Sequence, residues 1–92
     1  MSKADRTFEL VRIELERAQT YFDDFHTYHQ GFSVLKEEVD ELWKKIMDKN
    51  PDRDEVRREA IHVAAMAIRF IVDLDTAANP RGLRLMKKIG GE

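Results

Sequence analysis

The segment GFSVLKEEVDELWKKI, which runs from Gly31 to Ile46, carries the clearest pattern in the chain. Four of its apolar side chains recur at the spacing of one helical face: Leu35, Val39, Leu42 and Ile46. Glu38 and Glu41 are three residues apart, so they are neighbours on the same helix. Glu38 lies about 80° from the centre of the apolar face, at its edge. Two carboxylates beside a core-facing stripe are costly unless a positive group lies between them, and a divalent cation is such a group because hard cations take oxygen ligands.

The composition of the whole chain predicts one soluble, helical domain. The chain has 92 residues, of which 37% are charged, with only four glycines and two prolines. A net charge of −2 gives no general attraction to nucleic acid or to an anionic membrane. The absence of cysteine excludes disulfides and thiolate metal sites. The first residues lack an apolar signal core, and charges interrupt the most apolar region, Ala60 to Leu74, so we expect a cytoplasmic protein with no membrane span.

The periodicity predicts an all-α fold of three main helices. We expect them to run from about Lys3 to Asp23, from Thr27 to near residues 48–50, and from Pro51 to about Asp75. Thr27 with Gln30 forms a capping-box pattern at the expected start of the second helix. Asn50 is the expected cap of the third helix, with Pro51 in its first turn. The first helix is interpreted as scaffold.

The third helix is the most apolar and should lie at the centre of the bundle. Its apolar residues form two stripes, Val56, Ala60, Val63, Ala67, Phe70 and Leu74 in one and Ile61, Ala64, Ile68 and Ile71 in the other. Two stripes imply contacts on two sides. Three helices with a two-sided central helix leave apolar surface uncovered, so we expect a homodimer or a dimer of dimers, that is, a tetramer.

Glu59 is the most informative residue outside the opening segment, because it lies along the first of these stripes. An ionised carboxylate on an apolar face is expensive without a partner. One interpretation is a salt bridge to an arginine such as Arg69 of another helix or subunit. The other is a metal ligand shared with Glu38 and Glu41. His62 has two interpretations as well, a structural histidine or a ligand beside Glu59.

The acidic residues also resemble a known pattern. Glu37-Glu38-Val39-Asp40-Glu41-Leu42 resembles the first metal motif, EExxE, of the MazG-like family of all-α nucleotide pyrophosphohydrolases. The second motif of that family, ExxD, lies on the next helix. Here Glu59-Ala60-Ile61-His62 stands at a suitable distance, with histidine in place of aspartate. The resemblance covers roughly Phe22 to Leu74.

The resemblance implies a homo-oligomeric helical bundle that hydrolyses a nucleoside triphosphate to the monophosphate and pyrophosphate. It implies Mg²⁺ or Mn²⁺ bound by Glu38, Glu41 and Glu59, with His62 in the place of the aspartate. Glu37 would act with Glu38 in catalysis, either from behind the metal ligands or by helping to orient a water. Imidazole is a poor ligand for Mg²⁺ and a better one for Mn²⁺, so His62 implies an altered metal preference, a water-bridged Mg²⁺ or an inactive site.

Substrate contacts are predicted at three further positions. His29 lies just before the acidic motif, in a segment that either lines a nucleotide site or carries surface and capping residues. Arg69 and Asp73 continue along the edge of the third helix that carries His62. The basic tail, residues 79–92, either packs as a short helix, approaches the triphosphate through its cations, or is frayed.

Two other functional classes stay open. Glu-x-x-His on one helix facing Glu-x-x-Glu on another is part of the ligand pattern of di-metal carboxylate bundles, and a complete site of that kind would need the dimer. The third class is a non-catalytic helical oligomer with a degenerate metal site.

Overall fold

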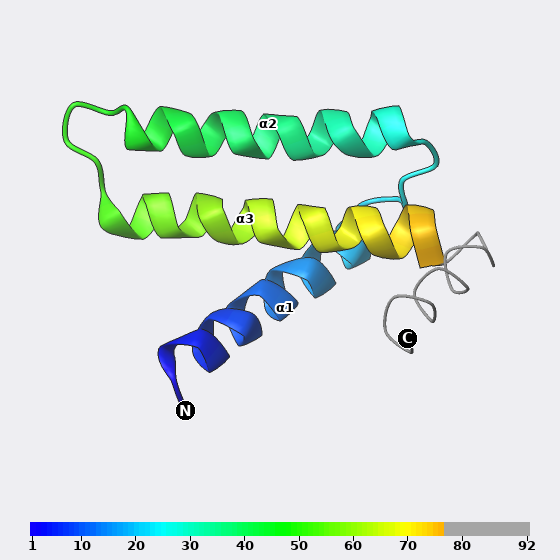
Figure 1. Cartoon of the computed structure of the whole chain (residues 1–92), viewed down its shortest axis with the longest axis horizontal. Helices are drawn as coiled ribbons and strands as arrows, with labels where there is room; N and C mark the ends of the chain where they lie inside the picture. The colour runs from blue at the N-terminus through cyan, green and yellow to red at the C-terminus, as the bar shows by residue number, and fades with distance from the viewer. Residues whose placement is uncertain (77–92) are drawn as a thin grey trace, which may run out of the picture.

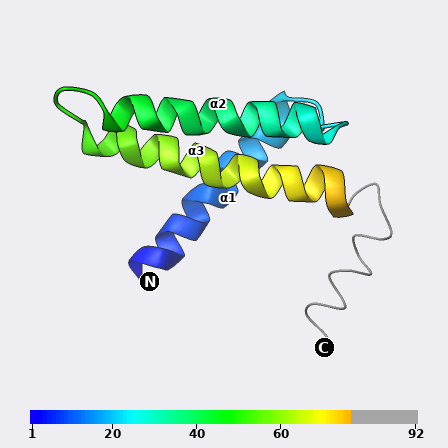
Figure 2. The same cartoon turned by 45° about the horizontal axis from the view of Figure 1, so that its top comes forward.

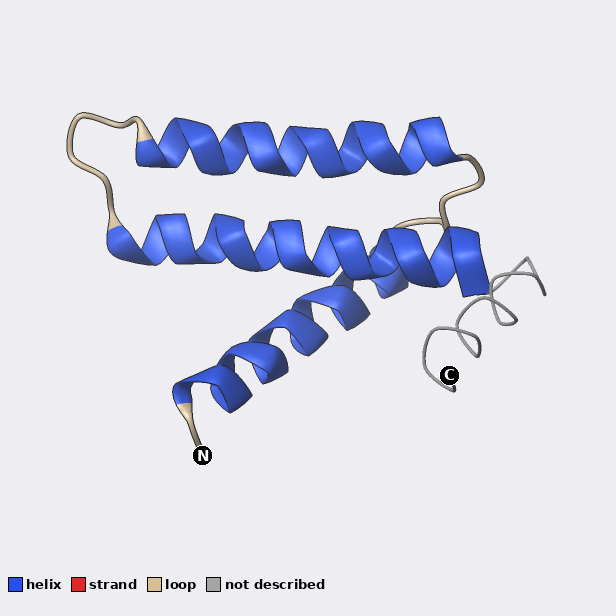
Figure 3. Cartoon of the chain, viewed as in Figure 1, coloured by secondary structure: helices blue, strands red, loops and turns tan. Residues whose placement is uncertain are grey.

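The computed structural model describes residues 1–76, which form three α-helices (Figure 1). They are α1 (Lys3–Tyr21), α2 (Tyr28–Ile46) and α3 (Arg53–Ile71), and a π-helical turn, Val72–Thr76, continues α3. The described residues contain no strand (Figure 3), which confirms the all-α prediction. The predicted tail, residues 79–92, lies outside the described residues.

Side-chain caps explain where the first two helices begin. Ser2 and Asp5 form a reciprocal capping box at the start of α1. At the start of α2, the Thr27 hydroxyl accepts the Gln30 amide at 3.0 Å, as predicted. The Gln30 side chain reaches one residue further back than expected, to the His26 amide at 2.7 Å. These bonds occupy amides that have no partner within the helix.

The predicted start of α3 was wrong by two residues. Asp52, and not Asn50, is its N-cap, and its carboxylate accepts the amides of Asp54 and Glu55 at 2.8 and 3.2 Å. A carboxylate that satisfies two free amides and faces the positive end of the helix dipole is the better cap. Pro51 therefore precedes the cap. α2 also ends earlier than predicted, at Ile46.

The prediction that α3 is the central helix is confirmed. α2 and α3 run antiparallel side by side, and α1 crosses them obliquely (Figures 1 and 2). α3 packs against both of the other helices. Its small, fully buried Ala65 lets α1 come close, so that Val11 and Ala18 of α1 share one core cluster with Ala65 and Met66.

The face that α2 turns toward α3 is rotated from the predicted one. Leu35 packs against the core, whereas Val39 and Ile46 of the same predicted stripe are exposed. Gly31 is buried at this interface, and a Cβ there would lie 2.6 Å from the Phe70 ring. The close approach at Gly31 turns Glu38, placed by the sequence at the edge of the apolar face, inward toward α3.

Two buried charged residues fasten the α1–α2 connection to the end of α3. The Asp73 carboxylate accepts the Phe25 amide at 3.0 Å, and Arg69 Nε lies 3.5 Å from the same carboxylate. The Arg69 guanidinium lies 4.0 Å from the centre of the Phe25 ring and donates to the Asp23 carbonyl. Arg69 and Asp73 are only 4% and 7% exposed. Pairing and hydrogen bonding make the burial of these charges tolerable.

A substantial part of the apolar surface stays uncovered in the described residues. Five exposed side chains lie along one side of α2 and are called the α2 apolar stripe: Tyr28, Phe32, Val39, Trp43 and Ile46. The N-terminal half of α1 extends away from the other helices (Figure 2) and exposes Phe8 and Leu10. No helix in the described part of the chain combines the length and the hydropathy needed to cross a bilayer.

Candidate metal centre

Glu38 from α2 and Glu59 and His62 from α3 converge between the helices. One ligand atom from each of the three lies within 4.8 Å of the other two. His62 Nδ1 is 3.6 Å from Glu38 Oε2 and 3.5 Å from Glu59 Oε2. Both of these oxygens are buried and have no hydrogen-bond partner within residues 1–76. α3 brings Glu59 and His62 together because residues three apart are neighbours on a helix.

The donor set fits a divalent cation. With ligand bonds of about 2.1 Å and an angle of about 110° at the ion, two donors lie about 3.4 Å apart. The observed separations of 3.5 and 3.6 Å are close to that spacing. An ionised carboxylate only accepts hydrogen bonds. A cation or a proton between these groups would satisfy both oxygens at once.

The electrostatics of Glu38 agree with this picture. Burial raises the pKa of the Glu38 carboxyl, and the nearby Glu41, Glu59 and Glu14 add to the rise, while His62 opposes it. Burial and like charges both disfavour the ionised form. A cation bound among these carboxylates would remove the repulsion.

A cavity of about 510 Å³ opens beside the three ligands. Its polar wall includes Glu37, Glu38, Glu41 and His62. Another part of the lining consists of Phe22, Phe25, Asp23, Gln30 and Arg69. The cavity thus combines a carboxylate-rich wall with aromatic surface.

The structure brings together only some of the predicted site residues. Glu38, Glu59 and His62 form the cluster, whereas Glu37 and Glu41 are exposed on the cavity wall beside it. Glu41 is close enough to raise the pKa of Glu38, but it is not one of the three clustered ligands.

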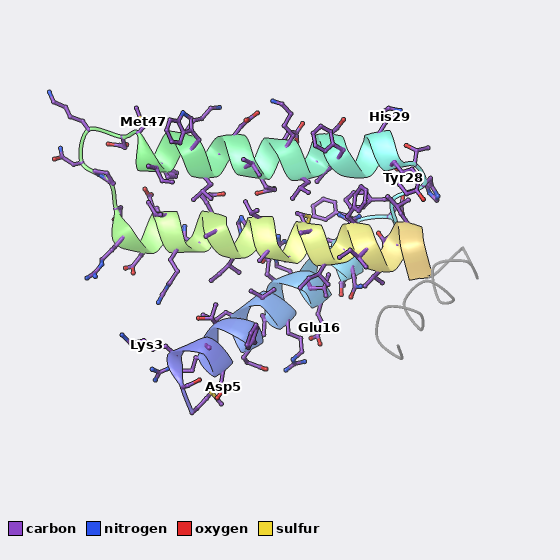
Figure 4. The ribbon with its side chains drawn as sticks, in the orientation of Figure 1. Lys3, Asp5, Glu16, Tyr28, His29 and Met47 are labelled. Carbon is purple, nitrogen blue, oxygen red and sulfur yellow. The ribbon has the colours of Figure 1, made fainter. Side chains whose placement is uncertain are left out.

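The three residues predicted to contact substrate, Arg69, Asp73 and His29, lie outside the cluster of Glu38, Glu59 and His62. Arg69 borders the cavity, but its guanidinium engages Asp73 and the α1–α2 connection. Within residues 1–76, Glu59 therefore does not pair with Arg69, and a pairing of Glu59 with an arginine of another subunit stays a prediction. His29 is exposed on the side of α2 away from α3 (Figure 4) and borders a separate cavity of about 450 Å³, together with Asp73.

Glu14 and Arg17 were not predicted as site residues, because α1 was interpreted as scaffold. Glu14 Oε2 lies 3.7 Å from His62 Nε2, and both residues line the same cavity. Arg17 donates two hydrogen bonds to Glu14, at 2.7 and 2.9 Å. A usable signal existed in the sequence, since Glu14 lies three residues after Val11 and four before Ala18, the two buried residues of α1.

Comparison of the chain with models of known protein families, with curated proteins and with solved structures found no match. The molecule is therefore described by its own geometry. It is a small all-α protein of three helices, with a cluster of Glu38, Glu59 and His62 that could hold a metal ion.

Proposed function

We propose that this protein is a metal-dependent hydrolase that converts a nucleoside triphosphate to the monophosphate and pyrophosphate. The observation that carries the proposal is the convergence of one imidazole nitrogen and two carboxylate oxygens beside the 510 Å³ cavity, where neither oxygen has a hydrogen-bond partner among residues 1–76. Cavities of about 300–1,000 Å³ suit ligands of nucleotide size. The resemblance of the two acidic motifs to those of MazG-like pyrophosphohydrolases supplies the reaction.

Each residue then has a distinct part. Glu38, Glu59 and His62 would hold the cation, and Glu41 lies on the wall of the same cavity, outside this group of three ligands. When bound, the cation supplies positive charge to the phosphates and acidifies the attacking water. Glu37 accepts a hydrogen bond from that water and orients it toward the α-phosphorus, from which pyrophosphate departs. Phe22 and Phe25 offer apolar surface for the base.

The donor set also indicates which metal works best. Imidazole suits Mn²⁺, Fe²⁺ or Zn²⁺ better than Mg²⁺, which prefers oxygen ligands. We therefore propose that Mn²⁺ supports turnover better than Mg²⁺. Replacing the imidazole with a carboxylate, by His62→Asp, should move the preference toward Mg²⁺. Identical metal profiles of both proteins would show that His62 is not a ligand.

The direct test is a pyrophosphate-release assay across the common nucleotides with Mg²⁺ and with Mn²⁺. The parent protein should release pyrophosphate, and Glu38→Gln should abolish release. Glu16→Gln is the matched control, because Glu16 is an exposed carboxylate that pairs with Arg12 on α1. Equal activity in all three proteins, or no activity with any nucleotide and metal, would refute the proposal.

A second candidate is a di-metal carboxylate protein. It is favoured by the observed placement of Glu59 and His62, a Glu-x-x-His pair, opposite Glu38 of a Glu-x-x-Glu pair. Two metals would then be shared by two chains. Metal analysis after anaerobic loading with Fe²⁺ tests it, since a bridged pair requires one iron per chain and an oxo-to-iron absorption after exposure to air. Failure of this test together with no pyrophosphate release would leave the non-catalytic oligomer.

A further inference from the structure

His62 is contacted on both of its ring nitrogens. Nδ1 faces Glu38 and Glu59, and Nε2 lies 3.7 Å from Glu14 Oε2 on α1. Neutral imidazole carries one proton, so one nitrogen donates a hydrogen bond while the other offers a lone pair. Which nitrogen is free to bind a metal is set by the hydrogen bond that the other nitrogen makes.

Glu14 differs from the other carboxylates on its helix. Its side chain is 15% exposed, against 58% for Glu16, and only Glu14 among the α1 carboxylates has an ion-pair contact with a residue of another described helix. Arg17 holds both of its oxygens through two hydrogen bonds. A carboxylate fixed in this way is oriented before any ligand arrives, because a guanidinium binds it in a planar, bidentate manner.

We propose that Glu14 is a positioning residue for His62: it accepts the Nε2 proton and thereby leaves Nδ1 as the metal-binding nitrogen. The inference rests on the proposed metal centre. Metal-binding histidines in proteins commonly donate their second ring N–H to a carboxylate, which fixes the tautomer and the ring orientation. Arg17, Glu14 and His62 form such a chain of contacts from the surface of α1 to the ligands on α2 and α3. α1 is therefore part of the centre, and all three helices build it.

The tautomer can be read without any metal. Long-range ¹H–¹⁵N NMR of the metal-free parent protein above the titration range of imidazole reports which nitrogen of His62 carries the proton. Without metal, Glu14 at Nε2 competes for the imidazole proton with the two carboxylates at Nδ1. The expected result is a larger fraction of His62 protonated on Nε2 in the parent protein than in Glu14→Gln. Equal fractions in the two proteins would overturn the inference. This measurement needs neither metal nor activity.

Metal affinity provides the second test. Titration with Mn²⁺ alone should show that Glu14→Gln weakens binding by about 10- to 100-fold, the range found for carboxylates behind metal-binding histidines. Glu16→Gln, the matched control, should leave the affinity unchanged. In a His62→Asp background, Glu14→Gln should change the affinity by less than about twofold, because a residue that acts through imidazole has nothing to position there.

The outcomes separate this inference from the proposed function. If the parent protein binds Mn²⁺ and Glu14→Gln binds it equally well, the positioning role is wrong and the metal centre stands. An equal loss of affinity with and without His62 would also overturn the positioning role, because Glu14 would then act through its charge alone. If the parent protein binds no Mn²⁺, the metal centre fails, while the NMR measurement still decides what Glu14 does to His62.

Discussion

At the scale of single residues, the Glu59 carboxylate is 13% exposed and, within residues 1–76, His62 alone approaches it at ion-pair distance. Its Oε2 has no hydrogen-bond partner there. The arginine that the sequence offers as a partner, Arg69, is bound to Asp73. A cation would therefore satisfy the Glu59 carboxylate. Replacing this carboxylate with a neutral side chain would leave no buried cation of residues 1–76 without its partner.

Glu59→Gln should leave the metal-free protein as stable as the parent or more stable, because it removes one of several like charges and nearly keeps the shape. It should also remove most of the stabilisation by Mn²⁺. At a hundredfold excess over Kd, that stabilisation is about 2.7 kcal/mol in the parent protein, which corresponds to a rise in Tm of about 10 °C or more. Thermal melts in EDTA and in Mn²⁺ measure both effects. A loss of several kcal/mol in EDTA, with no metal effect on the parent, would rule out the metal centre.

The raised pKa of Glu38 predicts opposite pH trends with and without metal. A folded-state pKa above the unfolded value means that the folded protein binds more protons, so this contribution to stability is complete below the unfolded pKa and is lost as pH rises through the folded pKa. Over the pH interval that begins at the ordinary glutamate pKa of about 4.3, the free energy of unfolding of the metal-free parent should therefore fall relative to Glu38→Gln as pH rises. Stabilisation by Mn²⁺ should grow over the same interval, because the metal competes with the proton. Denaturant unfolding of both proteins across this interval measures the trends, and parallel curves would contradict them.

At the scale of helices, the first residue of α3 depends on whether Asp52 or Asn50 is its N-cap. Asp52→Ala should lower the free energy of unfolding by about 1 kcal/mol, because two α3 amides lose their acceptor. Asn50→Ala is the matched control and should change it by less than about 0.5 kcal/mol, since Asn50 lies outside the helix. Urea unfolding of the two variants decides between the caps, and a larger loss in Asn50→Ala would restore the boundary predicted from sequence.

The helices themselves could be predicted from sequence because their apolar spacing and the Thr27 cap are local signals. The inward face of α2 could not, because it depends on the contact of Gly31 with Phe70, which are distant in sequence. The shared site of Glu38 and Glu59 was predicted from their positions along two helices, whereas His62 was left open between a structural residue and a ligand, and Glu41, predicted as a ligand, lies outside the cluster. The contact of Glu14 with His62 could not be predicted, because the crossing of α1 over α3 is a tertiary feature that helical periodicity does not encode.

At the scale of the whole molecule, the α2 apolar stripe is the surface that we expect a second copy to cover. Its three aromatic side chains, Tyr28, Phe32 and Trp43, are each about 60% exposed. With Val39 and Ile46, the stripe offers roughly 500 Å² per chain, or about 1,000 Å² when two copies pair, close to what a specific interface needs.

Trp43→Glu should therefore convert a dimer into a monomer or an unfolded chain, because it places a charge within the stripe. Phe8→Glu is the control, an exposed aromatic side chain on α1 that lies outside the stripe, and should leave the mass unchanged. Sedimentation equilibrium at micromolar concentration measures this. A stable, folded monomer of the parent protein would contradict the prediction.

The hydrogen bond from the Phe25 amide to Asp73 has a kinetic consequence. It joins residues 48 positions apart, so the amide can reach solvent only when the end of α3 separates from the connection between α1 and α2. In deuterated water, the Phe25 amide should therefore exchange at the slow rate of tertiary opening, although it lies outside any helix. The amide of the neighbouring, exposed Asp24 should exchange far faster. In Asp73→Ala the two rates should converge, so a single loop amide reports how often the end of α3 separates from the connection between α1 and α2.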